Sequence, residues 1–289
     1  MIWRGPTGIC ERLSVILDEI DVDFKKAAMI AKAAGLKAIE LRMAFGRNII
    51  DLSDSQLLKI KKHLKSLGLQ ISALATPLFK CFIPGEERKG KIGDQFGFQA
   101  NDYLTHKALI GRILEIADIF EVKAVRCFSF WNSGPLNETK LQQIAELLAP
   151  AVEAVSRARK MLILENENSC YIKTAQDASR LLSLLKTPSV RFLWDPGNGK
   201  LEGEDEEIAF TYAKRWVQHV HIKDFIFQNG KINFVIPGKG VVRYQTILAG
   251  LQQISYEGFL SFEPCLGTLD KATFIKIVNE FFELCRSSI

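Results

Sequence analysis

The chain has few histidines and no closely paired cysteines. Among its 289 residues are four histidines and six cysteines, and no two of the cysteines form a C-x-x-C pair. This absence argues against a zinc ribbon and against a thioredoxin-like redox motif. In a chain of this length, unpaired cysteines indicate reduced thiols, so we expect a cytoplasmic protein.

Three further features are missing. No apolar run approaches the roughly 18 residues that a membrane span needs. The N-terminal segment MIWRGPTGICERLSV lacks a basic stretch followed by an apolar one, so we expect neither a signal peptide nor a membrane partner. No G-x-G-x-x-G follows an early strand, which disfavours a doubly wound nucleotide-binding sheet.

The composition is that of an ordinary globular protein, with 47% hydrophobic and 25% charged residues. The formal net charge is +5. A surplus this small suits an anionic small molecule but does not indicate a nucleic-acid partner.

Short apolar strands alternate with amphipathic helical segments along the whole chain. Eight strands are expected, each followed by a helical segment, near residues 9–15, 36–42, 69–76, 122–130, 161–167, 190–195, 217–224 and 258–264. Strands this continuously apolar are buried on both faces, as in a parallel sheet. The pattern predicts an α/β fold, a single (β/α)₈ TIM barrel over residues 1–289, with an open sheet as the alternative. Long connections are expected at 76–100 and 225–240.

Polar side chains end several of these apolar runs. Glu165, Asp195 and Glu263 end the fifth, sixth and eighth strands, and the seventh carries His219 and His221. Catalytic groups of barrels lie at the carboxyl ends of strands. Earlier strands contribute further polar residues at the same end: Glu40, Arg42, Lys80 and Arg126.

Three buried carboxylates in succession are costly unless they are paired or bind a metal. Three oxygens and one nitrogen suit a single Mn²⁺, Mg²⁺, Co²⁺ or Zn²⁺ in a site left open to substrate. Residues two apart in a strand share a face, so His219 and His221 point the same way. We expect His221 to be the ligand because it lies nearer the carboxyl end.

Several motifs together resemble a known family. L-E-N-E at 164–167, W-D-P-G-N at 194–198, H-V-H-I-K-D at 219–224 and G-F-L-S-F-E-P at 258–264 are similar to those of xylose isomerase-like TIM barrels. These proteins are also called sugar phosphate isomerases/epimerases, and the group includes inosose dehydratase and endonuclease IV. The resemblance implies that Glu165, Asp195, His221 and Glu263 bind one divalent metal. It also implies that Glu165 and Glu263 act as acid and base.

The implied chemistry is proton removal next to a carbonyl. A metal on the carbonyl and a neighbouring hydroxyl stabilises the developing enediolate as a Lewis acid, and epimerisation needs a base and an acid on opposite faces. Lys223 lies two residues past His221 and could hold an oxyanion or phosphate, although a solvated strand-end lysine is the ordinary alternative. The residues expected to bind substrate are Lys223, Asn198, Arg126, Glu40 and Lys80.

The chain departs from the family pattern at several positions. Asn198 stands where many relatives have histidine. Ile232 and Phe234 align with two extra ligands of endonuclease IV, so a three-metal nuclease site cannot be assembled. Phe227 stands where 3-epimerases carry an arginine that touches substrate oxygens.

The leading hypothesis is therefore a metal-dependent isomerase or epimerase of a small-molecule carbohydrate or sugar phosphate. The alternative is a lyase of the inosose or dehydroshikimate dehydratase type at the same metal. A non-catalytic sugar-binding barrel is the third class. The sequence leaves the substrate, the metal and the oligomeric state open, a homo-oligomer included.

Overall fold

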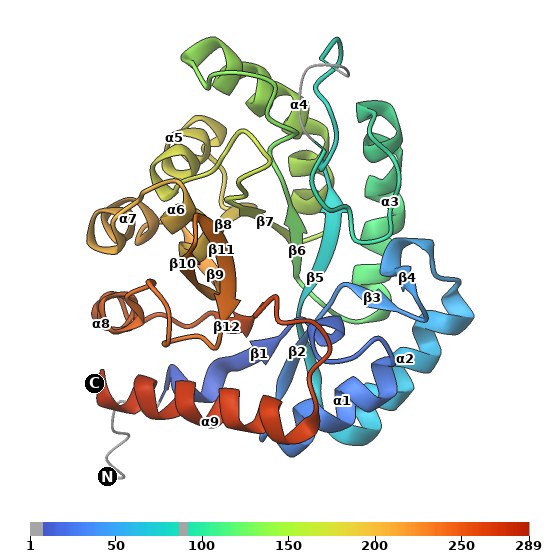
Figure 1. Cartoon of the computed structure of the whole chain (residues 1–289). Coiled ribbons are helices and arrows are strands. Elements are labelled where there is room, and N and C mark those ends of the chain that lie inside the picture. Colours follow the sequence, from blue (N-terminus) through green and yellow to red (C-terminus); the bar gives the residue numbers. More distant parts are fainter. Residues whose placement is uncertain (1–7, 87–91, 289) are drawn as a thin grey trace, which may run out of the picture.

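Eight parallel strands form the central sheet of the computed structural model, which describes residues 8–86 and 92–288 (Figure 1). They are β1 (Leu13–Val15), β2 (Ala38–Leu41), β5 (Gln70–Leu78), β6 (Ala124–Cys127), β7 (Met161–Glu165), β8 (Val190–Trp194), β9 (Val217–Ile222) and β12 (Phe259–Phe262). Their order in the sheet is β1-β12-β9-β8-β7-β6-β5-β2, and a parallel bridge between Ile16 and Glu40 joins the two outer strands. The prediction of a (β/α)₈ barrel is confirmed. That residues 1–289 form one domain stays a prediction.

Helices follow the strands and surround the sheet (Figure 1). They are α1 (Phe24–Ala33), α2 (Asp54–Leu67), α3 (Tyr103–Ile119), α4 (Glu138–Arg157), α5 (Ala175–Leu185), α6 (Pro196–Leu201), α7 (Glu206–Ala213), α8 (Tyr244–Gln253) and α9 (Lys271–Ser287). Most begin at a side chain that accepts a hydrogen bond from a free backbone N–H, as Ser53 does in a capping box with Gln56. At the end of α2, Gly68 takes a φ of 67°, which a glycine adopts without strain. No described helix is both long and apolar enough to cross a membrane.

The barrel interior is filled differently from the layer between strands and helices. The large apolar cluster packs the strands against the helices, whereas Ala73, Ile163 and Leu193 form a small separate cluster. The hydroxyls of Ser14 and Ser72 share a buried hydrogen bond of 2.8 Å.

Two expected segments differ in the structure. Cys10–Arg12 forms a 3₁₀-helix, so the first strand is only Leu13–Val15, the three residues that pair with β12. The connection expected over 225–240 contains an antiparallel hairpin of β10 (Asp224–Gln228) and β11 (Lys231–Val235). A second hairpin, β3 (Met43–Ala44) with β4 (Arg47–Asn48), follows β2. Short 3₁₀-helices also lie at Leu17–Glu19 and Ile49–Asp51.

The chain between β5 and α3 is the other long connection. Strand β5 continues to Leu78, two residues beyond the expected end. Part of the connection, residues 87–91, lies outside the described residues. Its later part, around Asp94 and Phe96, lines the cavity described below.

Candidate metal centre and substrate pocket

A cavity of about 590 Å³ lies at the carboxyl ends of the barrel strands. Four residues predicted from the sequence line it: Lys80, Asn198, Lys223 and Glu263. Arg42 and Glu167 line it as well. A volume of this size is typical of small-molecule sites.

Four side chains converge at the floor of this cavity. Glu165 ends β7, Asp195 follows β8, His221 lies in β9 and Glu263 follows β12. Each offers one ligand atom, and these atoms lie within 4.8 Å of one another. His221 Nδ1 is 3.2 Å from Glu165 Oε1, 3.4 Å from Glu263 Oε2 and 3.9 Å from Asp195 Oδ2.

The donor set fits a divalent metal ion. All four side chains are nearly or fully buried, with at most 4% exposure. Asp195 Oδ2 accepts no hydrogen bond of good geometry, although Lys223 Nζ lies 2.8 Å from it. Three carboxylates and one imidazole nitrogen within 4.8 Å of one another, with Glu263 in the cavity wall, are the ligands that Mn²⁺, Mg²⁺, Co²⁺ or Zn²⁺ accepts.

Three cations hold these carboxylates in place. Arg126 Nη1 donates to Glu165 Oε2 at 3.1 Å, and Arg42 Nη1 donates to Glu263 Oε1 at 3.1 Å. Lys223 Nζ contacts Glu263 Oε2 at 2.9 Å as well as Asp195. Such pairing offsets the cost of burying several like charges together.

The protonation of the cluster follows from burial and these neighbours. Burial raises the pKa of Asp195 to about 6, although Lys223 lowers it in part. Burial also acts to raise the pKa of Glu263, but Lys223, His221 and Arg42 hold it well below its usual range. The buried His221 has a pKa well above its usual range because Glu40, Glu165 and Glu263 surround it.

Glu40 lies beneath His221 rather than in the cavity wall. Its side chain is fully buried, and its Oε2 accepts from the Nε2 atoms of His219 and His221, each at 3.1 Å. His219 and His221 therefore do face the same way, as predicted. The contact with Glu40 leaves Nδ1 of His221 directed at the carboxylate cluster.

That Glu40 and Arg126 contact substrate stays a prediction. Neither residue lines the cavity, and both are fully buried. Arg126 also donates to the carbonyl oxygens of Ala75 and Thr76, which fixes its guanidinium behind Glu165. Their contacts are those of residues that orient His221 and Glu165.

The other predicted contact residues lie on the cavity side. Asn198 donates through its side-chain amide to Asn166 O at 2.8 Å, and its Oδ1 accepts from Lys223 at 3.3 Å. Lys80 Nζ lies 4.5 Å from the ring centres of Phe96 and Phe128 and donates to Asp94 O at 3.0 Å.

Glu167 was missed in the sequence, although a signal for it exists. It lies two residues after Glu165, the same spacing that relates His221 to Lys223. Its carboxylate lies 3.6 Å from Lys80 Nζ. Asp18 and Glu19, which pair with Arg42, carry no comparable signal because they lie in a 3₁₀-helix after the short first strand.

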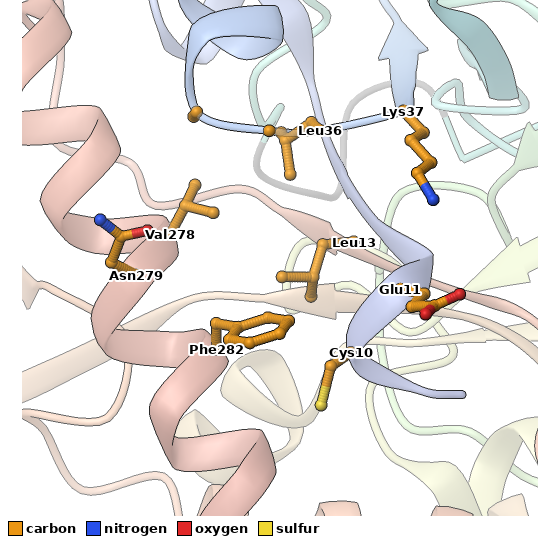
Figure 2. Close-up of a pocket in the computed structure, with 10 residues that line it drawn as sticks. Cys10, Glu11, Leu13, Leu36, Lys37, Val278, Asn279 and Phe282 are labelled. Atoms are coloured by element: carbon orange, nitrogen blue, oxygen red, sulfur yellow. The ribbon is translucent and has the colours of Figure 1, made fainter. Parts of the chain in front are cut away.

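A second cavity of about 320 Å³ lies at the opposite end of the barrel (Figure 2). Leu13 and Lys37, at or just before the starts of β1 and β2, line it with Phe282 of α9. Figure 2 shows mostly apolar side chains there, with Glu11 and Lys37 as the charged ones. None of its lining residues belongs to a described cluster of potential metal ligands. We therefore take the first cavity as the candidate site.

Curated relatives of similar sequence are named inosose dehydratase. One from Clostridium perfringens is 27% identical over 144 residues, which are 44% of this chain and 48% of that protein. This match thus spans about half the length of the relative. One from Clostridium botulinum is 29% identical over 268 residues, 83% of this chain and 81% of that protein.

Solved structures share the fold. A probable 3-DHS dehydratase from Bacillus anthracis superposes with a TM-score of 0.73 at 17% identity, covering 93% of this chain and 98% of that one. A 3-keto-D-glucoside 4-epimerase from E. coli superposes with a TM-score of 0.69 at 17% identity, covering 95% and 99%. At these identities the likeness shows the fold alone.

The family is shown by a match that covers most of the chain. The model described as "Xylose isomerase-like TIM barrel" matches residues 29–276, which include every residue of the carboxylate and imidazole cluster. The chain belongs to the xylose isomerase-like TIM barrel family.

Proposed function

We propose that this chain is a divalent-metal-dependent isomerase or epimerase that removes a proton next to the carbonyl of a polyhydroxylated ketone. One observation carries the proposal. Glu165 and Glu263 come from strands separated in the sheet by β8 and β9, yet their carboxylates lie 3.2 and 3.4 Å from the same atom, His221 Nδ1. Two carboxylates that reach one point from different strands can act as base and acid on two sides of a substrate.

Glu165, Asp195, His221 and Glu263 would hold the metal. When bound, the metal would act as a Lewis acid that polarises the substrate carbonyl, worth several kcal/mol of charge stabilisation. Side chains of this chain would transfer the protons and orient the substrate.

Glu165 and Glu263 are the proposed proton carriers. Arg126 restrains Glu165 and Arg42 restrains Glu263, so each carboxylate keeps one direction toward His221 Nδ1. A proton carrier held in this way stays within hydrogen-bond reach of a substrate carbon or oxygen. Lys223 lies between Asp195 and Glu263 and would donate to a substrate oxygen at the cavity floor.

A dehydratase is the second candidate, and the names of the relatives favour it. Both reactions begin with the same proton removal, and they differ in whether a hydroxyl on the next carbon leaves. Lys223 is an ammonium group at the floor of the cavity, 2.8 Å from Asp195 and 2.9 Å from Glu263. It is therefore placed to protonate a departing hydroxyl.

The test is a substrate panel run in deuterated water. Protein loaded with Mn²⁺ is incubated with ketoses and inososes, and NMR measures deuterium at the carbon next to the carbonyl. Label in an isomerised or epimerised product supports the first candidate. Deuterium at that carbon, or loss of its hydrogen, together with an unsaturated ketone product that absorbs in the ultraviolet supports the second candidate.

Two results would contradict the proposed chemistry. Isomerised product free of solvent label would indicate a hydride shift between carbons, with the glutamates acting only as ligands. Full turnover in Glu165→Gln and Glu263→Gln variants with measured, equal metal content would remove both residues from proton transfer.

A further inference from the structure

The charges around the cavity differ in sign from the charge of the whole chain. The chain has a net charge of +5, which by itself suits an anionic ligand. Yet more carboxylates than cations line the cavity, and five acidic side chains contribute to its wall: Asp18, Glu19, Asp94, Glu167 and Glu263. Local charges outweigh distant ones because those farther than about 8–10 Å are screened by salt.

The cations that line the cavity are already paired. Arg42 donates through Nε to Asp18 at 2.8 Å, through Nη2 to Glu19 at 2.5 Å and through Nη1 to Glu263 at 3.1 Å. It is 5% exposed and is fixed by three carboxylates. It has no freedom to turn toward a phosphate without leaving those carboxylates unpaired.

Lys223 and Lys80 are engaged in the same way. The ammonium group of Lys223 forms ion pairs with Asp195 at 2.8 Å and Glu263 at 2.9 Å and donates to Asn198 Oδ1 at 3.3 Å. Lys80 donates to Asp94 O, lies 3.6 Å from Glu167 and is 2% exposed beneath aromatic rings. In the described part of the chain, therefore, the cavity wall offers no cation without a partner.

We propose that the cavity selects neutral, unphosphorylated polyhydroxy ketones and rejects their phosphate monoesters. This inference rests on the proposed function because it names the substrate class of the same site. Sugar hydroxyls donate hydrogen bonds, and the wall is rich in carboxylate acceptors such as Glu167 and Asp18. A phosphate group carries about two negative charges and would meet those same carboxylates.

The experiment measures binding of matched pairs rather than turnover. Protein loaded with Mn²⁺ is titrated with D-fructose and D-fructose 6-phosphate, and with D-tagatose and D-tagatose 6-phosphate, by calorimetry or ligand-observed NMR. We expect each ester to bind at least about tenfold more weakly than its parent, from like-charge repulsion at an effective dielectric constant near 20.

A variant tests the cause. Glu167→Gln removes the carboxylate nearest Lys80, so it should lower the ratio of the Kd of the ester to the Kd of its parent sugar at least about threefold. The matched control is Glu121→Gln, which breaks another glutamate–lysine pair, with Lys61 at 2.6 Å, on an exposed surface outside the cavity. This control should leave the ratio of the two Kd values unchanged.

Three outcomes would overturn the proposal: esters that bind as well as their parents, neutral sugars that do not bind at all, or a ratio of Kd values that Glu167→Gln leaves unchanged. The reaction is judged separately, by solvent deuterium. A protein that prefers neutral sugars but exchanges no proton would keep this inference and lose the proposed function. A protein that exchanges protons only in phosphate esters would keep the proposed function and lose this inference.

Discussion

Replacing Glu40 with glutamine should weaken metal binding although Glu40 is not itself one of the four predicted ligands. The carboxylate of Glu40 accepts from Nε2 of both His219 and His221 at 3.1 Å. Glutamine keeps the size of the side chain but has one acceptor oxygen and a donor amide. Both imidazoles contact one oxygen of Glu40, so the glutamine oxygen can still accept from them, but it carries no negative charge, and its amide would lie where Glu40 Oε1 has no hydrogen-bond partner.

The size of the effect follows from what this contact does. A carboxylate bonded to the remote nitrogen fixes the ring orientation and tautomer of a metal-binding histidine, and its removal costs about 10–100-fold in metal affinity. That range corresponds to about 1.4–2.8 kcal/mol. The fully buried position gives water no route to solvate the added amide.

The assay is a Mn²⁺ titration against a competing chelator at a pH where both variants are folded. Glu206→Gln is the matched control, because Glu206 is 2% exposed and accepts from Arg243 and Lys200 outside the metal cluster. The control should lower the melting temperature and keep Mn²⁺ affinity within about twofold of the wild type. Equal Mn²⁺ affinity in Glu40→Gln and wild type would refute the orienting role of Glu40.

The remaining predictions concern turnover, pH and stability. Glu165→Gln and Glu263→Gln should each slow solvent exchange about 10²–10⁴-fold, measured at saturating Mn²⁺ with the bound metal quantified. Because burial raises the pKa of Asp195 to about 6 and a ligand must be deprotonated, Mn²⁺ affinity should fall as pH drops through 6; a flat profile from pH 8 to pH 5 would contradict this. Asp224→Ala should destabilise the fold by at least about 2 kcal/mol in urea unfolding, because the carboxylate accepts from four backbone N–H groups. An unchanged midpoint and slope of the urea unfolding curve would show that water replaces the four hydrogen bonds of Asp224.

The proximity of the candidate metal ligands could be predicted from the sequence because it depends on a local rule. A polar residue directly after an apolar strand lies at the carboxyl end of that strand, and all strands of a parallel barrel present that end to one side. Glu165, Asp195 and Glu263 satisfy this rule one strand at a time, without knowledge of any distant contact.

The supporting contacts could not be predicted in this way because their partners are far apart in the chain. Glu40 is separated from His221 by 181 residues, and Arg42 from Glu263 by 221. Nothing in the local pattern around Glu40 distinguishes a residue beneath a histidine from one that contacts substrate. The difference depends on depth in the barrel, which the strand register determines.

The sequence carries a recognisable signal for the hairpin after β9. Asn229 and Gly230 lie between the two strands and have φ values of 52° and 72°. Positive φ at both central residues is the mark of a type I′ turn, and Asn-Gly is its preferred sequence. The hairpin places Phe234 at the cavity, so this turn shapes the site as well as the fold.

One face of β9 explains how the parts of the site are arranged in depth. His219, His221 and, just after the strand ends, Lys223 follow one another at a spacing of two, so their side chains share a direction and differ mainly in depth. The deepest imidazole meets Glu40, the middle one joins Glu40 to the ligand carboxylates, and the ammonium group meets Asp195 and Glu263 at the cavity. Each level therefore pairs a nitrogen of β9 with carboxylates from other strands. Because a shift of one residue in the register of β9 would turn all three nitrogens away from the interior, the site and the strand pairing depend on each other.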